Sequence, residues 1–345
     1  MYDSYLYVVY KRLSQRLLSK RKLQFGFTLP QGWRWLDYIP GNTSAIQYEF
    51  SKKMAQIADS LHYDSVYAYD HFIPYFKGNL EVNFFECYVL LSAILAVTKR
   101  LRIGQTVTCN PYRNPALLAK MISTMDVISN GRMELGIGAG WYEKEFRSYG
   151  YDFPPNIDRI RQLDEALHII RSMWTKRMTT FNGKYYSIEG AVCKPKPIQV
   201  PHPKIMVGGS GEKHLLRVVA KHANRYNQAF VSPEELQRKN SILKDHCAHI
   251  GREHNDIERS VLLRCLIRET EDEIRRDIKK WKTKNETIEQ FEKRIDSQAV
   301  IGSPDQVISK LNQYVAVGVT HFVMHFIGLN ERTLKLFDSK IIKKM

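Results

Sequence analysis

Short runs of β-branched and aromatic residues alternate with amphipathic segments along most of the chain. The first run, 24–30, is followed by apolar residues at helical spacing in 44–61, with Ser44 as a candidate N-cap. The alternation predicts strands at 24–30, 64–70, 101–109, 132–138, 204–208, 225–230, 259–268 and 320–326. It predicts helices at 44–61, 84–97, 115–128, 157–174, 212–222, 233–250, 305–317 and from residue 330, with a charged, solvent-facing helical stretch at 269–294.

One segment departs from this alternation. Residues 179–188 place Asn182 and Gly183 between β-rich flanks, which is a strong hairpin signal, and four prolines make 194–203 an extended connection. Eight strand–helix pairs are the number that closes a parallel barrel. The sequence therefore predicts an α/β fold, a (β/α)8 TIM barrel with a β-hairpin and Pro-rich connection inserted after the fourth helix. An open, doubly wound sheet is the alternative.

Length and composition fit this prediction. A chain of 345 residues with 43% hydrophobic and 26% charged residues suits one barrel with a sizeable core and excludes disorder as the main state. We expect residues 23–345 to form a single barrel domain, preceded by a basic N-terminal extension, residues 1–22.

The chain is strongly basic, with 52 Lys and Arg against 36 Asp and Glu. Such an excess suits an anionic partner, which could be nucleic acid, an acidic membrane or a phosphorylated cofactor. No nucleic-acid-binding module is recognisable and aromatic residues do not interleave with the basic clusters, so a solvated basic surface is favoured and no nucleic-acid partner is expected. The longest apolar run, 87–97, is shorter than the roughly 20 residues that span a bilayer, so no membrane partner is expected.

Cysteine and histidine positions narrow the chemistry further. The five cysteines are widely spaced without a CxxC pair, which favours a reducing, cytoplasmic location. His246, His249 and His254 fall at a predicted helix end without acidic partners, so no metal site is expected. GxSxG, HExxH and Walker sequences do not occur, which removes the usual support for the corresponding hydrolases and NTPases.

In a barrel of this type, the working residues lie at the carboxyl ends of the strands and in the loops that follow. This rule selects Asp70 and His71, the segments 106–110, 138–141, 208–211 and 227–230, and His325. Near neutral pH His71 can donate or accept a proton, and Asp70 can orient it or contact a cofactor. A purely structural histidine is the alternative.

Two glycine-rich segments lie among these strand ends. Gly208, Gly209, Ser210 and Gly211, called the glycine turn below, precede a helix predicted from Glu212, and their N–H groups could bind a phosphate. A flexible turn with a glycine cap is the alternative. The second segment, 136–140, reads GxGxG rather than GxGxxG and lies outside the first βαβ unit, so we expect it to admit a planar ring system rather than to form a dinucleotide fold.

These strand ends resemble the bacterial-luciferase-like superfamily, specifically its F420-dependent oxidoreductase branch. The similarity runs from about residue 23 to 268 and is weaker in 303–326. It is most specific in YDHFIPY (69–75), TCNPYRNPALLAKMISTMDVISNGRMELGIGAGWYEKEF (108–146), YGYDFPP (149–155) and KPKPIQVPHPKIMVGGSGE (194–212).

The resemblance implies a deazaflavin or flavin at the carboxyl-terminal mouth of the barrel. In similar enzymes an Asp-His pair after the second strand touches the cofactor and can donate a proton, which corresponds to Asp70 and His71. A non-proline cis peptide supports the ring, which corresponds to Thr106 and Val107, and the glycine turn matches the phosphate site. The full set of implied cofactor-binding residues is Asp70, Thr106, Val107, Thr108, Gly140, Gly208, Gly209, Ser210 and Gly211.

One position departs from the family pattern. In the family's sugar-phosphate dehydrogenases a catalytic Glu follows the glycine run, whereas this chain has Trp141 there, with Glu143 and Glu145 further along. A Trp suggests a flatter, less charged substrate.

We therefore predict a cytoplasmic enzyme that transfers a hydride between coenzyme F420 and a small organic substrate, with a homodimer as a candidate assembly. The alternatives are an FMN-dependent luciferase-like monooxygenase and a non-catalytic barrel that binds a cofactor or RNA.

Overall fold

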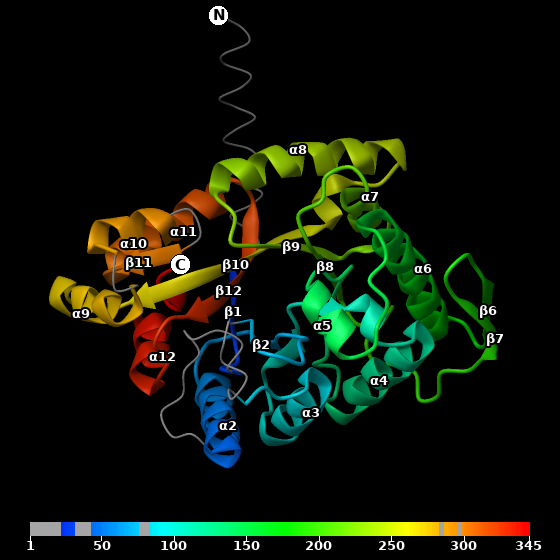
Figure 1. Ribbon diagram of the computed structural model, residues 1–345, viewed down its shortest axis with the longest axis horizontal. Coiled ribbons are helices and arrows are strands. Elements are labelled where there is room, and N and C mark those ends of the chain that lie inside the picture. Colours follow the sequence, from blue (N-terminus) through cyan, green and yellow to red (C-terminus); the bar gives the residue numbers. More distant parts are fainter. Residues whose placement is uncertain (1–21, 32–42, 76–82, 283–285, 296–298) are drawn as a thin grey trace, which may run out of the picture.

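Parallel strands form a barrel, with helices on its outside (Figure 1). The computed structural model describes residues 22–31, 43–75, 83–282, 286–295 and 299–345. Within them the barrel strands are β1 (Gln24–Thr28), β2 (Ser65–Ala68), β3 (Arg102–Gln105), β4 (Thr108–Cys109), β5 (Leu135–Gly138), β8 (Ile205–Gly208), β9 (Arg225–Ala229), β10 (Glu258–Ile267) and β12 (Val319–Phe326). Pairing runs β3-β2-β1-β12-β10-β9-β8-β5-β4, and Ile103 bridges Met133 to close the circle. Because β3 and β4 share the third position, the predicted (β/α)8 barrel is confirmed.

The helices form the outer layer in chain order. They are α2 (Ser44–Ser60), α3 (Cys87–Val97), α4 (Pro115–Ile128), α5 (Glu143–Ser148), α6 (Asn156–Thr175), α7 (Leu215–His222), α8 (Pro233–His249), α9 (Glu271–Trp281), α10 (Ile288–Ile295), α11 (Pro304–Ala316) and α12 (Glu331–Phe337). Three shorter turns are η2 (Asn110–Tyr112), η3 (His254–Asp256) and η5 (Asp338–Ile342). The apolar faces of the helices pack on the strands, and Leu118, Ile122 and Leu163 are completely buried between the two layers.

Local sequence explains where these helices begin. Asn114 accepts hydrogen bonds from the N–H groups of Ala116 and Leu117, and Pro115 occupies the first helical position of α4. Thr43, rather than the predicted Ser44, caps α2 by accepting from the Ile46 N–H at 3.3 Å. Ser44 is already helical, so that prediction was one residue late.

The insertion after α6 has the predicted form. Strands β6 (Thr179–Asn182) and β7 (Ser187–Ala191) pair antiparallel, and this hairpin stands at the side of the barrel (Figure 1). In the Pro-rich connection, the Lys194–Pro195 and Val200–Pro201 bonds are cis.

Three predicted elements need correction. The third strand is divided between β3 and β4 at Thr106–Val107, and this bond is cis, as the family resemblance predicts. The charged stretch 269–294 contains two helices, α9 and α10, and it is not wholly solvent-facing because Ile274 and Ile278 are buried against Leu266. A short strand, β11 (Ala299–Gly302), pairs with the end of β10 and was not predicted.

The helix after the glycine turn begins at Leu215 and not at Glu212. Residues 212–214 form a turn because Glu212 is held by α8: its carboxylate accepts from Arg238 at 2.5 Å, and its carbonyl accepts from Nε2 of His246 at 3.1 Å. The helix N-terminus is therefore set back from the turn.

A polar network closes the amino-terminal end of the barrel. Glu134 is 1% exposed and accepts from Arg225 at 2.9 Å, from Arg102 at 2.7 Å and from the Tyr67 hydroxyl at 2.8 Å. Burial alone would raise the pKa of Glu134, but Arg225 and Arg102 hold it well below its usual range. The apolar side chains of Met206, Leu262 and Val323 form a separate buried cluster that includes Tyr67. The mouth at the opposite end consequently has a closed floor.

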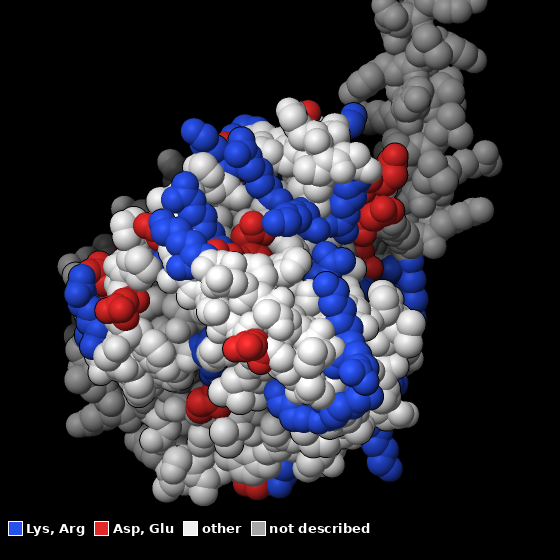
Figure 2. Space-filling view, turned by 90° about the vertical axis from the view of Figure 1, so that its right-hand side faces the viewer, with Lys and Arg blue, Asp and Glu red and all other residues white. Residues whose placement is uncertain are grey.

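Basic residues are prominent on one side of the molecule (Figure 2). On the face that carries α6 and the hairpin, Lys and Arg form long stretches and acidic side chains are scattered (Figure 2). Of the predicted extension, residues 1–22, all but Lys22 lie outside the described residues. Among the helices that the structure describes, none is long and apolar enough to cross a membrane. All five cysteines are buried and free.

Candidate active site at the barrel mouth

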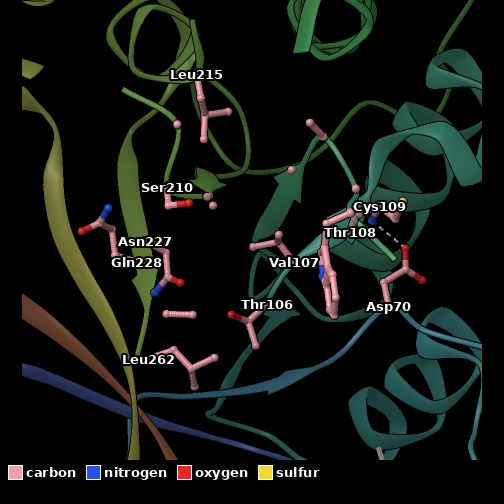
Figure 3. Close-up of a pocket in the computed structure, with 18 of the residues that line it drawn as sticks. Asp70, Thr106, Val107, Thr108, Cys109, Ser210, Leu215, Asn227, Gln228 and Leu262 are labelled. Carbon is pink, nitrogen blue, oxygen red and sulfur yellow. Dashed lines mark hydrogen bonds between the residues drawn. The ribbon is translucent and has the colours of Figure 1, made fainter. Parts of the chain in front are cut away.

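A cavity of about 520 Å³ opens where the barrel strands end. It is lined by all the residues for which a catalytic or cofactor-binding role was predicted from the family resemblance: Asp70, His71, Thr106, Val107, Thr108, Gly140, Gly208, Gly209, Ser210 and Gly211. Figure 3 shows Thr106–Thr108 of the third strand position on one side, with Ser210 and Asn227 on the other. The barrel thus brings together residues that are separated by up to 141 positions (211 − 70) in the chain. Their individual roles remain predictions.

Glycines keep the cavity wall flat. A Cβ on Gly208 would lie 2.8 Å from Cγ1 of Val107, and one on Gly138 would lie 3.0 Å from its Cγ2. At Gly209 φ is +139°, and a Cβ would lie 2.5 Å from Leu215 Cδ2. Only glycine therefore fits at these positions, where β5 and β8 pack directly on Val107 and the turn packs on Leu215. The cavity of about 520 Å³ that these residues line has room for a planar ring, so the residues present fit a flavin or deazaflavin.

His71 is held by a buried carboxylate. Its Nδ1 lies 2.8 Å from Oε2 of Glu145, a fully buried residue of α5. The same carboxylate accepts from the Tyr112 hydroxyl at 2.6 Å and from the backbone N–H groups of Phe72 and Ile73 at 2.6 and 3.0 Å. Burial alone would raise the pKa of Glu145, but the hydrogen bonds from His71 and Tyr112 lower it below its ordinary value. The ionised carboxylate fixes the histidine ring and the loop that carries it.

Asp70 faces away from this pair. Its carboxylate accepts from both terminal nitrogens of Arg113 at 2.7 and 2.9 Å, and from the Cys109 N–H at 2.9 Å (Figure 3). Burial raises the pKa of Asp70, and Arg113 opposes this rise. Burial would lower the pKa of Arg113, but Asp70 raises it above its ordinary value. Asp70 therefore fastens β4 to the end of β2, and it does not contact His71 in the way that the sequence suggested as one option.

Aromatic rings surround His71 at the rim of the cavity. Trp141 is 52% exposed, and its ring centroid lies 6.1 Å from that of His71 in an edge-to-face arrangement. Tyr75 and Tyr142 each lie 5.3 Å from Trp141. Such rings present flat, largely uncharged surfaces to a ligand.

His325, the other candidate, lies deeper. It is 1% exposed and is not among the cavity-lining residues. Its Nδ1 lies 3.1 Å from Oγ1 of Thr28 and 2.9 Å from the hydroxyl of Tyr69, which does line the cavity. His325 thus supports the cavity from below, through Tyr69.

Sequence reasoning did not identify Glu145, Tyr112 and Arg113 as site residues. All three follow strand ends, which is the signal that could have selected them, but they stand three to seven positions beyond the strands. Whether a side chain at that distance points into the site depends on how the intervening turn or helix is oriented, and a single sequence does not specify that orientation.

Comparisons with known proteins agree with this arrangement. A family model described as luciferase-like monooxygenase matches residues 27–321. An F420-dependent glucose-6-phosphate dehydrogenase of Amycolatopsis mediterranei is 26% identical over 314 residues, covering 84% of this chain and 92% of the relative. An FMNH(2)-dependent dimethylsulfone monooxygenase of Pseudomonas putida is 32% identical over 162 residues, covering 47% of this chain and 44% of the relative.

Solved structures share the fold. An F420-dependent secondary alcohol dehydrogenase in complex with an F420-acetone adduct superposes with a TM-score of 0.75 at 19% identity, covering 93% of this chain and 98% of that chain. A long-chain alkane monooxygenase superposes with a TM-score of 0.78 at 16% identity, covering 94% of this chain and 91% of that chain.

Proposed function

This chain belongs to the luciferase-like monooxygenase family, and from this premise we propose that it is a coenzyme F420-dependent oxidoreductase that transfers a hydride between the deazaflavin and a small organic substrate. The observation that carries the proposal is the cavity that His71, Thr106, Val107 and the glycine turn line together. F420 is favoured because the relatives named for it match 81 to 84% of this chain.

The cavity would hold the cofactor through its own backbone and glycines. The ring would lie against Val107, whose side chain packs so closely on Gly138 and Gly208 that a Cβ at either glycine would collide with it. The phosphate would meet the N–H groups of the glycine turn. When bound, a deazaflavin supplies hydride chemistry with little reactivity toward oxygen, because carbon replaces the central ring nitrogen of a flavin.

His71 would hold and move the proton that accompanies hydride transfer. Nδ1 is occupied by the Glu145 carboxylate at 2.8 Å, so proton exchange with the substrate would involve Nε2. Glu145 keeps the ring in one orientation and stabilises its protonated form, as carboxylates beside catalytic histidines do. Trp141 at the rim favours a flat substrate with little charge.

The second candidate is an FMN-dependent monooxygenase. It is favoured by the 32% identity to the dimethylsulfone monooxygenase, although that match covers less than half of this chain. The glycine turn would accept the phosphate of either cofactor.

Absorbance and fluorescence titrations of the purified protein with F420 and FMN test the proposal. We expect saturable binding of F420, tighter than that of FMN. Binding of reduced FMN alone would favour the monooxygenase, and binding of neither would refute both. We further propose a cytoplasmic location, where the five free, buried cysteines would stay reduced.

A further inference from the structure

A lysine is buried in the wall of the cavity. Lys239, on the second turn of α8, is 3% exposed, and its Nζ lies 2.7 Å from Oε1 of Glu235. Lysines are seldom buried to this extent unless paired, because an ammonium loses its hydration. Glu235 is only a partial counter-ion, since 48% of its side chain remains exposed to solvent.

Lys239 lies beside the glycine turn. Both line the same cavity, and α8 is fastened to the segment just after the turn by the 2.5 Å contact between Arg238 and Glu212. The Lys239 ammonium is close enough to contribute to lowering the pKa of the Glu212 carboxyl, behind Arg238. The cavity therefore has the glycine turn on the β8 side and the Lys239 ammonium on the α8 side.

The glycine turn alone is a weak anion site. Its helix, α7, begins only at Leu215 and contains eight residues, so the partial charge of the helix end is set back from the turn. Backbone N–H groups are neutral donors, and a phosphate in a partly enclosed cavity needs a compensating cation.

We propose that Lys239 is the cationic half of this site: its ammonium binds the phosphate of the cofactor side chain, opposite the N–H groups of the glycine turn. The inference rests on the proposed function and deepens it. Glu235 neutralises Lys239 when no anion is bound. When the phosphate binds, the partly exposed Glu235 carboxylate turns toward solvent and the phosphate takes over part of its contact with Lys239. Ring compounds that lack a phosphate gain nothing from Lys239.

Paired ligands test this site. The affinities of F420 and FMN are compared with those of their phosphate-free chromophores, deazariboflavin and riboflavin, for wild type, Lys239→Met and Lys239→Arg. Lys244→Met, an exposed lysine of the same helix, is the matched control. Methionine keeps the volume of the buried chain, and thermal unfolding shows whether each variant is folded.

We expect Lys239→Met to weaken binding of the phosphorylated ligands about 10- to 100-fold, the range for loss of a charge-assisted hydrogen bond, and to leave the phosphate-free ligands unchanged. Lys239→Arg should restore most of the affinity, and Lys244→Met should match wild type. If Lys239→Met weakens binding of a phosphorylated ligand and of its phosphate-free chromophore equally, or weakens neither, the proposed site is overturned. Glucose 6-phosphate is also tested for whether it raises the thermal unfolding temperature. If Lys239→Met binds the cofactor normally but loses a stabilisation by glucose 6-phosphate that wild type shows, the proposed site is overturned and Lys239 contacts a substrate phosphate instead. A wild-type protein that binds none of the four compounds refutes the proposed function itself.

Discussion

His71 and Glu145 are 74 positions apart in the chain, yet Nδ1 of the histidine lies 2.8 Å from Oε2 of the carboxylate. Glu145 also accepts from the N–H groups of Phe72 and Ile73, so one side chain fixes both the histidine ring and its loop. A carboxylate placed in this way acts on the substrate through the histidine and not by itself. We therefore propose Glu145 as a positioning residue and His71 as the proton donor.

Removing either group should reduce turnover to different extents. We expect His71→Ala to lower kcat about 100-fold or more, because general acid–base catalysis contributes on that order. Glu145→Gln should lower kcat about 10- to 100-fold, because an amide holds the ring less firmly and cannot stabilise its protonated form. Steady-state rates and their pH profiles measure both effects, and cofactor titrations show whether the cavity is intact.

The double variant distinguishes a coupled pair from two separate contributions. If Glu145 acts through His71, adding Glu145→Gln to His71→Ala should cost almost nothing further in kcat. Multiplicative losses would contradict the pairing. Glu143→Gln, an exposed carboxylate of the same short helix, is the control and should keep the wild-type rate.

A second prediction concerns the glycine turn. Gly209→Asp should abolish binding of the phosphorylated cofactor, because φ is +139°, a Cβ would lie 2.5 Å from Leu215 Cδ2, and a carboxylate repels the phosphate. Gly211→Ala should be tolerated, since its Cβ would lie 3.4 Å from Leu215 Cβ. Binding isotherms for the two variants make the comparison. Wild-type affinity in a folded Gly209→Asp protein would remove the turn from the site.

A third prediction concerns stability in mild acid. Half-buried His254 accepts a hydrogen bond from Arg259 at Nε2, and burial together with this cation lowers the pKa of His254 from 6.5 to about 4. Between pH 6.5 and 4 the His254 imidazole is protonated in the unfolded chain but stays neutral in the folded protein. The free energy of unfolding should therefore fall between pH 6.5 and 4, and this contribution should level off below pH 4.

Denaturant unfolding at several pH values isolates that contribution. Over this interval the free energy of unfolding of His254→Asn should fall less steeply with decreasing pH than that of wild type. The difference in slope should correspond to at most one proton taken up on unfolding. His249→Asn changes an exposed histidine at the end of α8, five positions before His254, and should follow the wild-type curve. Parallel curves for wild type and His254→Asn would show that His254 titrates normally.

Most of the barrel could be predicted from sequence because each strand–helix pair carries its own pattern. The third strand was predicted as one run, since the break at Thr106–Val107 occurs within a β-rich stretch and leaves no mark in hydrophobic periodicity. The start of α7 was misplaced because Glu212 is held by Arg238 and His246, two contacts from a helix further along the chain. Tertiary contacts overrode local preference there.

The site was predictable in its outline only. Strand ends selected the residues that line the cavity, because the barrel brings all of those ends to one mouth. The partners of Asp70 and His71 were not predictable. Arg113, just after η2, contacts Asp70, and Glu145 of α5 contacts His71, and no sequence spacing connects either pair. The same holds for Lys239, whose burial depends on how α8 packs.

The last prediction separates hydride transfer from oxygenation. If the enzyme uses F420, substrate should oxidise the reduced cofactor as fast under nitrogen as under air, since a deazaflavin activates oxygen poorly. A flavin monooxygenase would stall without oxygen and would place an oxygen atom in its product. Stopped-flow absorbance under both gases measures the rate, and product mass after reaction in labelled oxygen gives the second readout. The cavity would accommodate either cofactor, because the flat wall at Val107 and the glycine turn meet features that both share. Strict oxygen dependence with reduced FMN, and no binding of F420, would overturn the cofactor assignment while leaving the roles of His71 and Glu145 to be tested in the monooxygenase reaction.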